Sequence, residues 1–249
     1  MNAIILAAGY GKRILSVTKK IPKCLIKVNN EAILIRWIKI LKKSGIKKIL
    51  INLHYKKNLV LQEVKKYNFS GLKFVHEKKL LGTAGTLLKN ISFFENHDGM
   101  VIHADNYSDE KDLKNFIKFH KKNNKKKITI FGFKTIDYKN SGIFEFNQKN
   151  DVINFYEKNY KKKKLNIGNG AIYVFRNRFL KEIKLLKIKD ITRDIIIKNL
   201  ESVKVYKSRN KIIDIGIPKN YLILKKKKLL MRNKLHDNLL SLLEKIAEK

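Results

Sequence analysis

The sequence predicts an α/β protein in which three layers surround a mixed, mainly parallel sheet. Short apolar runs alternate with segments whose apolar residues recur at helical spacing, a pattern typical of βα units around a parallel sheet. The 249 residues contain only two prolines and no internal repeat, so nothing marks a linker between two domains. After residue 133 the apolar spacing changes to that of paired strands, and the sheet is therefore expected to be mixed.

The first half of the chain alternates strands and helices. Residues 3–8 form an all-apolar strand bounded by Gly9 and Gly11, and the helical repeat of residues 33–41 stops at Gly45. Further strands are expected at residues 49–53, 72–75, 100–104 and 128–133, and further helices at 57–67, 84–90 and 110–121. Helices between successive strands provide the crossovers that parallel pairing requires.

The second half is expected to contain antiparallel strands. Residues 142–146 and 152–157 resemble a hairpin, and 171–175 is a strong strand. Asp190 is expected to cap a helix that runs to Asn199. Short strands at residues 203–206 and 212–215 and a helical tail at 219–247 complete the expected elements.

The chain is strongly basic, with 57 Lys and Arg against 21 Asp and Glu and a formal net charge of +36. Such a charge points to nucleic acid when the cations cluster on one face, but here lysines occur in almost every segment. A solvated cationic surface that attracts phosphorylated ligands is therefore favoured, and no specific nucleic-acid partner is expected. A basic nucleic-acid-binding module is the alternative from another class.

Several classes of protein are excluded by composition. No apolar run approaches the roughly 18 residues that span a bilayer, and the first nine residues lack a basic signal-peptide start. We therefore expect a cytoplasmic protein without a membrane span. Cys24, the single cysteine, is expected to be packed, and the six histidines show no zinc-ligand spacing. His54, His76 and His103 are expected to be structural, with satisfied hydrogen bonds.

A glycine-containing loop follows the first strand, where residues 6–13 read Leu-Ala-Ala-Gly-Tyr-Gly-Lys-Arg. Glycines let the backbone approach an anion closely, and the guanidinium of Arg13 could bind phosphate oxygens. Ile14 replaces the third glycine of a dinucleotide fingerprint, and Leu6 replaces the first glycine of a Walker loop. This segment alone leaves two interpretations open, a phosphate-binding loop and an ordinary tight turn.

Pro22-Lys23 follows this loop, and the combination resembles the N-terminal signature of the sugar-1-phosphate nucleotidylyltransferases. Further family elements follow in order over residues 1–221: Leu81–Gly85, Ala104–Asn106, Glu157-Lys158, Asn169–Ala171 and Asp214–Gly216. The segments at residues 52–55 and 103–106 look most like the small bacterial mannose- or heptose-1-phosphate guanylyltransferase-like branch. The resemblance implies a Rossmann-like, GT-A-like nucleotidyltransferase domain over residues 1–221, followed by a C-terminal helical tail at 222–249.

The resemblance also implies an activity. The enzyme would transfer a nucleotidyl group from a nucleoside triphosphate, GTP in this branch, to a mannose- or heptose-type sugar 1-phosphate, forming a nucleotide sugar for surface polysaccharide and releasing pyrophosphate. Because the attacking phosphate is already an anion, catalysis reduces to aligning two anions and neutralising charge. UTP, dTTP or CTP with glucose-1-phosphate or phosphocholine is the nearest alternative, and a non-catalytic nucleotide-sugar sensor is another.

Roles for individual residues follow from the same resemblance. Arg13 would hold triphosphate oxygens, Lys23 would stabilise the α-phosphate, and Asp105 and Asp214 would hold Mg²⁺, so that Arg13, Lys23 and Asp105 are the expected catalytic residues. The expected nucleotide-binding residues are Leu6, Ala7, Ala8, Gly9, Gly11, Arg13, Lys23, Gly82, Thr83, Ala84 and Gly85, and the expected sugar-phosphate-binding residues are Gly142, Glu157, Lys158 and Asn169.

Three points stay open in the sequence. No residue clearly matches the glutamine that many relatives place near the base. Glu157 could instead pair with surface lysines. The leucines of the tail could form a homodimer contact or pack within the chain.

Overall fold

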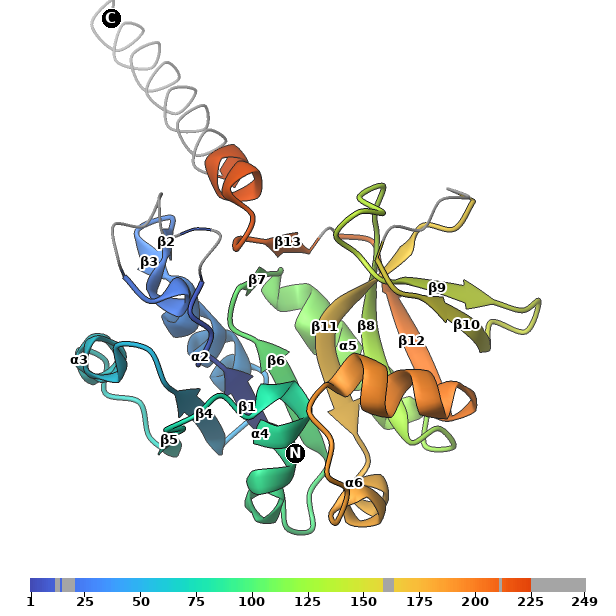
Figure 1. The fold of residues 1–249 in the computed structure, drawn as a ribbon, viewed down its shortest axis with the longest axis horizontal. Helices are drawn as coiled ribbons and strands as arrows, with labels where there is room; N and C mark the ends of the chain where they lie inside the picture. Colours follow the sequence, from blue (N-terminus) through green and yellow to red (C-terminus); the bar gives the residue numbers. More distant parts are fainter. Residues whose placement is uncertain (12–13, 15–20, 159–163, 211, 225–249) are drawn as a thin grey trace, which may run out of the picture.

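A nine-stranded sheet runs through the residues that the computed structural model describes, which are 1–11, 14, 21–158, 164–210 and 212–224 (Figure 1). Its strands are β1 (Asn2–Leu6), β4 (Ile49–Leu53), β5 (Leu72–His76), β6 (Gly99–His103), β8 (Ile128–Lys134), β9 (Ile143–Phe146), β10 (Val152–Tyr156), β11 (Ile167–Phe175) and β12 (Val203–Ser208). Two short ladders lie outside it, β2 (Lys27–Val28) with β3 (Glu31–Ala32), and β7 (Asn106–Tyr107) with β13 (Ile213–Asp214).

The helices of the described residues connect and cover these strands. The α-helices are α2 (Ile33–Lys43), α3 (Lys57–Lys65), α4 (Gly82–Lys89), α5 (Glu110–Lys122) and α6 (Asn177–Ile183). The 3₁₀ helices are η2 (Lys23–Leu25), η3 (Ile91–Phe93) and η5 (Ile197–Ser202), and η4 (Ile191–Ile196) is a π-helix. A further helix begins at Pro218 and continues to residue 224, so the predicted tail is described only at its start. No helix among the described residues is long and apolar enough to cross a membrane.

The strand order reverses next to β1. Strands β6, β1, β4 and β5 are neighbours in that order and parallel, so the chain adds β4 and β5 on one side of β1 and then returns to β6 on the other. Leu6 and His103 are paired at the carboxyl ends of β1 and β6. In open α/β sheets such a reversal leaves a crevice between neighbouring strand ends, and ligands bind there.

The other half of the sheet is built around β11. This strand pairs antiparallel with β6, β8 and β9, while β8 pairs parallel with β12, which confirms the predicted mixed sheet. The strand is longer than the predicted 171–175 and contains a register shift between Asn169 and Tyr173, where Ala171 has a φ of 51°. Gly170 lies in this bulge, and a Cβ there would come within 2.6 Å of the Phe131 carbonyl oxygen.

Alternating side chains of the strands divide the core into two layers. In β1, Ala3 and Ile5 face the side that α2, α3 and α5 cover, with Trp37 of α2 fully buried there. Ile4 faces the side that α4, α6 and η4 cover, where Phe179 of α6 is buried. The three predicted layers are thereby confirmed (Figure 1).

The segment after Asp190 differs from the prediction. Asp190 caps it as expected, accepting a hydrogen bond from the Arg193 backbone at 2.9 Å, but no α-helix runs to Asn199. A π-helix is followed by a 3₁₀ helix in which Asn199 has non-helical angles. Ile191, Ile195 and Ile196 are all buried, and the wider π turn brings residues i, i+4 and i+5 onto one face, as an α-helix does not.

Candidate active site

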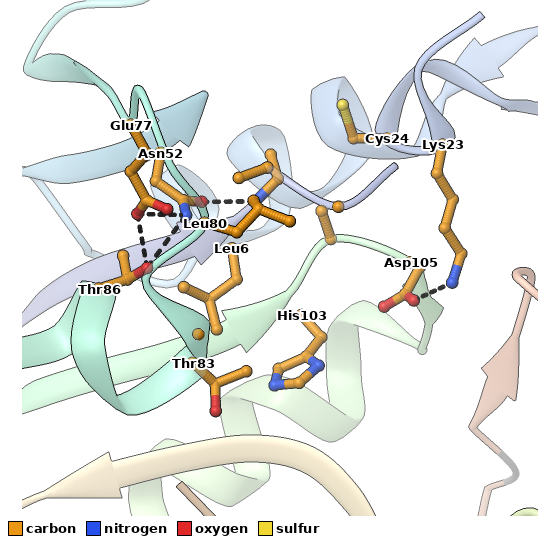
Figure 2. A pocket seen from close by; sticks show the side chains of 15 residues that line it. Leu6, Lys23, Cys24, Asn52, Glu77, Leu80, Thr83, Thr86, His103 and Asp105 are labelled. Carbon is orange, nitrogen blue, oxygen red and sulfur yellow. Dashed lines mark hydrogen bonds and ion pairs between the residues drawn. The ribbon is translucent and has the colours of Figure 1, made fainter. Parts of the chain in front are cut away.

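A cavity of about 240 Å³ opens at the carboxyl ends of β1 and β6, where the strand order reverses (Figure 2). Its wall brings together Leu6, Ala7, Ala8, Gly9, Lys23, Gly82 and Thr83, all of which the sequence singled out as nucleotide-binding. The rest of the wall consists of Cys24, Asn52, Glu77, Leu80, Thr86, His103, Ala104 and Asp105. We refer to this space as the first cavity.

Three described residues of the predicted nucleotide-binding set, Gly11, Ala84 and Gly85, lie outside the wall of this cavity. Ala84 is fully buried in α4 and packs in the core, and a Cβ on Gly85 would face Leu81 rather than the cavity. Gly11 packs against the side chain of Lys23 instead of lining the wall. Arg13 lies outside the described residues.

A buried polar network supports the loop that follows β1. The Asn52 Oδ1 accepts a hydrogen bond from the Ala7 N–H at 2.7 Å, and the Asn52 Nδ2 donates to Glu77 Oε1 at 2.9 Å. The Thr86 hydroxyl donates to the same Glu77 oxygen at 2.6 Å. Asn52 and Glu77 are only 3% and 4% exposed. This buried network therefore holds the loop that follows β1 against β4.

Sequence reasoning missed this network because its meaning depends on register. Asn52 stands beside Leu6 across the β1–β4 ladder, and that pairing aims its amide at the loop. The one local signal was a polar residue inside the otherwise apolar run of residues 49–53. Glu77 also places a carboxylate in the cavity wall. The sequence showed no match for the glutamine that many relatives place near the base.

Lys23 is the residue at which three motifs meet. Its ammonium contacts Asp105 Oδ2 and lies 3.6 Å from Asp214 Oδ1, and its side chain is only 14% exposed. The two aspartates approach each other because β7 pairs with β13: Asn106 stands opposite Asp214, and the Ile215 N–H donates to the Asp105 carbonyl at 3.0 Å. The predicted pair Asp105 and Asp214 is thus brought to one cation.

Two glycines make room for the Lys23 side chain. At Gly11, which has a φ of 64°, a Cβ would lie 2.9 Å from the Cβ of Lys23. At Gly216, a Cβ would lie 1.8 Å from the Lys23 Nζ. Any larger residue at position 216 would occupy the place of the ammonium. Gly11 and Gly216, from the first and last motifs, therefore both leave space for the side chain of Lys23.

Electrostatics at this point favour an ionised carboxylate. Burial by itself would raise the pKa of Asp105, but the adjacent Lys23 ammonium holds that pKa below its usual value. Burial lowers the pKa of His103, so its imidazole is neutral at pH 7. The site therefore presents a carboxylate that carries its charge over the whole neutral range.

His103 is not the satisfied structural histidine that the sequence suggested. Its Nε2 is buried and has no hydrogen-bond partner in the part of the chain that the structure describes. The prediction of a satisfied histidine was wrong because His103 ends β6 and its side chain lines the cavity wall instead of packing in the core. His54, by contrast, is satisfied: its ring nitrogens lie 2.7 Å from the Glu77 carbonyl oxygen and 2.8 Å from the Tyr10 hydroxyl.

The aspartate pair suits a hard divalent cation. Two carboxylates face one positive group, which the Lys23 ammonium supplies in this structure. Within the described ranges no cluster of three or more His, Cys, Asp or Glu is arranged around one point. A metal here would therefore complete its coordination with phosphate oxygens and water, the arrangement that Mg²⁺ favours beside nucleotides. The residues present fit Mg²⁺.

A second cavity of about 530 Å³ adjoins the first, and His103 and Asp105 line both. All four predicted sugar-phosphate residues, Gly142, Glu157, Lys158 and Asn169, lie in its wall, together with Asp214. Tyr173, Asp190, Thr192 and Arg193 also line it and were not predicted. Two chambers with a shared carboxylate can hold two ligands whose reacting ends meet at Asp105.

Contacts within the second cavity orient Asn169. Its Nδ2 donates to the Tyr173 hydroxyl at 3.2 Å, and its Oδ1 accepts from the Ala171 N–H at 3.0 Å across the bulge of β11. At Gly142 a Cβ would lie 2.2 Å from the Phe155 ring, so only glycine fits that part of the wall. Glu157 and Lys158 line the same cavity.

A family model and two curated relatives agree on the family to which this chain is similar. Residues 2–229 match the sequence model of the family described as Nucleotidyl transferase. A D-glycero-α-D-manno-heptose 1-phosphate guanylyltransferase of Campylobacter jejuni is 31% identical over 225 residues, which cover 89% of this chain and 97% of the relative. The mannose-1-phosphate guanylyltransferase catalytic subunit beta of Drosophila melanogaster is 28% identical over 89% of this chain, which spans 61% of that longer relative.

Solved structures give the same fold. HddC from Yersinia pseudotuberculosis, crystallised in complex with GMP-PN, aligns with a TM-score of 0.76 and 26% identity over 91% of this chain and 98% of its own. The inositol-1-phosphate CTP transferase of T. maritima aligns with a TM-score of 0.73 over 90% of this chain and 95% of its own. At 20% identity, that second likeness concerns the fold alone.

Proposed function

This chain belongs to the nucleotidyl transferase family, and we propose that it transfers the guanylyl group of GTP to a mannose- or heptose-type sugar 1-phosphate, forming a GDP-sugar. The observation that carries the proposal is the pair of adjoining cavities with Asp105 in their common wall. The guanine base is supported by the names of the Campylobacter and Drosophila relatives, both guanylyltransferases, and by the GMP-PN ligand of the Yersinia protein.

In this reaction an oxygen of the sugar phosphate attacks the α-phosphorus of GTP. A new oxygen–phosphorus bond forms, the bond from the α-phosphorus to the bridging oxygen breaks, and pyrophosphate leaves with the electron pair. No side-chain nucleophile is needed because the attacking oxygen is already anionic. The protein supplies alignment and positive charge.

Residues of the first cavity would hold the nucleotide. The small residues Ala7, Ala8 and Gly9 let the base and ribose approach the backbone closely, and the Asn52 network keeps that backbone in place. Lys23 would donate to α-phosphate oxygens and neutralise the charge that develops there. Arg13 is proposed to bind the outer phosphates.

Asp105 and Asp214 would hold Mg²⁺, which neutralises phosphate charge when bound. The β7–β13 ladder, together with the hydrogen bond from the Ile215 N–H to the Asp105 carbonyl, brings the two aspartates together. The strand ladder would thus keep the acidic pair at the boundary of the two cavities.

Residues of the second cavity would hold the sugar phosphate. Glu157 and Asn169 would bind sugar hydroxyls, and Lys158 would pair with the phosphate. Tyr173 restrains the Asn169 amide and so fixes which hydrogen-bonding group the sugar meets. With this division, the two phosphates would lie on either side of Asp105.

Location and assembly belong to the same proposal. We expect a cytoplasmic enzyme, because nucleoside triphosphates are available there. A homodimer through the tail and the division of the chain at residue 221 stay predictions, since residues 225–249 lie outside the described part of the chain.

The test is a grid of substrates scored by pyrophosphate release from the purified protein with Mg²⁺. GTP, UTP, dTTP and CTP are each combined with mannose-1-phosphate, a heptose 1-phosphate, glucose-1-phosphate and phosphocholine, with EDTA as the control. A metal-dependent signal for GTP with mannose- or heptose-1-phosphate is expected. A signal confined to another pair would overturn the choice of substrates, and silence throughout, with salt-sensitive RNA binding that ignores Asp105→Asn, would favour the nucleic-acid alternative.

A further inference from the structure

We propose that Lys23 and a divalent cation compete for the same two carboxylates, so that Lys23 keeps free metal away from Asp105 and Asp214 until a nucleotide offers the ammonium another partner. The inference rests on the proposed function in one respect, the assignment of these aspartates to a metal. It goes beyond that function because Lys23 would control when the metal can bind, in addition to binding phosphate.

The contacts of Lys23 carry the first step. Its Nζ contacts the Asp105 carboxylate and lies 3.6 Å from that of Asp214 (Figure 2 shows the Asp105 contact). A metal that used both carboxylates would have to lie between them, where the ammonium already lies. Two cations cannot share that place, because their radii overlap and like charges a few ångströms apart repel.

The packing around Lys23 limits what can move. Its backbone begins η2, where the Leu25 N–H donates to the Pro22 carbonyl at 2.9 Å, and Cys24 beside it is buried. Gly11 and Gly216 lie against this side chain at its Cβ and at its Nζ, and neither has a side chain of its own there. Because the backbone is held in η2, exchange of the ammonium for a metal would occur by rotation of the Lys23 side chain.

The first cavity supplies the alternative partner. Lys23 and Asp105 both line it, so a triphosphate bound there would bring several anionic oxygens within reach of the ammonium. Lys23 would leave the aspartates for these oxygens, and the carboxylates would be released to the metal that accompanies the nucleotide. Metal and nucleotide binding are then positively coupled, each strengthening the other.

This coupling predicts opposite effects of one substitution. Removing the Lys23 charge strengthens the binding of metal alone, because a competitor is lost. The same change weakens the binding of nucleotide, because a phosphate partner is lost. A variant that merely destabilised the site would weaken both, so the pair of signs separates competition from structural damage.

The experiment uses the full chain and two probes, Mn²⁺ alone measured by electron paramagnetic resonance, and GTP alone measured by calorimetry with EDTA present. The variants are Lys23→Met, Lys23→Met with Asp105→Asn, and the matched control Lys27→Met at an exposed lysine of β2. Circular dichroism checks that each is folded. We expect Lys23→Met to bind Mn²⁺ at least tenfold tighter than the wild type and GTP at least tenfold weaker, with Lys27→Met unchanged.

Each further outcome decides between the claims. Equal or weaker Mn²⁺ binding by folded Lys23→Met overturns the competition. If the double variant keeps the tight Mn²⁺ binding, the metal lies elsewhere, and the inference fails together with the assignment of Asp105. Failure of the proposed reaction is read separately, from the wild-type pyrophosphate grid, and leaves the metal titration standing.

Discussion

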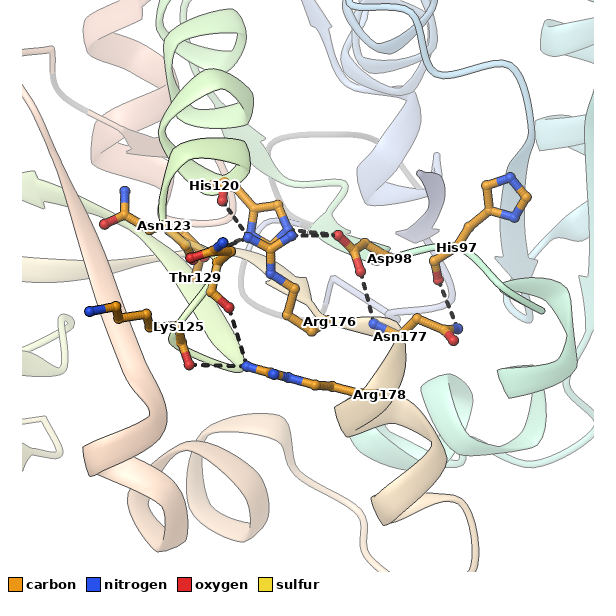
Figure 3. Close-up of polar contacts among 10 residues, drawn as sticks. His97, Asp98, His120, Asn123, Lys125, Thr129, Arg176, Asn177 and Arg178 are labelled. Carbon is orange, nitrogen blue, oxygen red and sulfur yellow. Dashed lines mark hydrogen bonds and ion pairs between the residues drawn. The ribbon is translucent and has the colours of Figure 1, made fainter.

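A polar network around Asp98 joins the beginning of β6 to α5, β8 and the end of β11 (Figure 3). The Asp98 Oδ2 accepts from Arg176 Nη1 at 3.0 Å and lies 3.0 Å from His120 Nε2, while its Oδ1 accepts from the Asn177 N–H at 2.8 Å. Asp98 precedes β6, whereas the candidate active site lies at the other end of that strand. We predict that Asp98→Asn destabilises the fold and leaves the KM values for both substrates unchanged.

The magnitude follows from the pKa of Asp98. Burial acts to raise this pKa, but hydrogen bonds from His120 and Asn177 and the charge of Arg176 lower it from 3.8 to about 2. The native state then binds the proton less well than the unfolded chain, so the ionised carboxylate adds stability that is present above pH ~4 and is lost as the pH falls towards 2. At ~1.4 kcal/mol per pKa unit, this contribution is about 2 kcal/mol at pH 7 and roughly half of that at pH 3.

The assay is equilibrium unfolding in urea, followed by circular dichroism at pH 7 and pH 3. Asp98→Asn keeps the shape of the side chain and removes its charge, and Glu201→Gln makes the same chemical change at an exposed residue. The control should change the free energy of unfolding by less than about 0.5 kcal/mol. The electrostatic reasoning is refuted if Asp98→Asn costs no more than the control at pH 7, or if its cost does not shrink at pH 3.

Three further predictions concern the site and its frame. Asp105→Asn should keep the wild-type circular dichroism spectrum and lower the rate of pyrophosphate release more than tenfold; near-normal turnover by the folded variant would contradict the role of that carboxylate. Gly170→Ala should lower the free energy of unfolding by about 1–3 kcal/mol, because its Cβ would lie 2.6 Å from the Phe131 carbonyl oxygen; an unchanged urea midpoint would show that the bulge can relax. Burial raises the pKa of the Cys24 thiol to about 12, so at pH 8 the native protein should react with a disulfide reagent far more slowly than the protein in urea; equal rates would show an accessible thiolate.

Much of the fold was predictable because its signals are local. The apolar runs that became β1, β4 and β6 and the helical repeat of α2 appear at nearly the predicted bounds. Such segments are specified by which neighbouring residues are apolar. Burial of these apolar side chains on both faces of the sheet stabilises the strands that contain them. The predicted family and enzyme class are likewise confirmed by the family match and the Campylobacter relative.

The errors occurred where packing overrode local spacing. The helix predicted from Asp190 to Asn199 is present as a π-helix followed by a 3₁₀ helix, and the π-helix buries Ile191, Ile195 and Ile196. The first half of β11 was missed because Gly168 and Gly170 interrupt its apolar run. Both glycines are in the strand because neighbouring side chains and backbone leave no room for a Cβ, which is a property of the partners rather than of the strand.

The residue types at the candidate site were determined by the sequence alone: a glycine loop after the first strand, a lysine after a proline, and two aspartates beside short strands. Only the tertiary structure decided that Lys23 meets Asp105, 82 residues away, and that the β7–β13 ladder carries Asp214 to the same ammonium. It also decided that Asn52 faces the Ala7 amide and that His103 lines both cavities. The physical reason is that side-chain chemistry and backbone preference belong to each residue and its neighbours. Which residues meet depends instead on strand order and register, and these are set by how the whole chain buries its apolar surface.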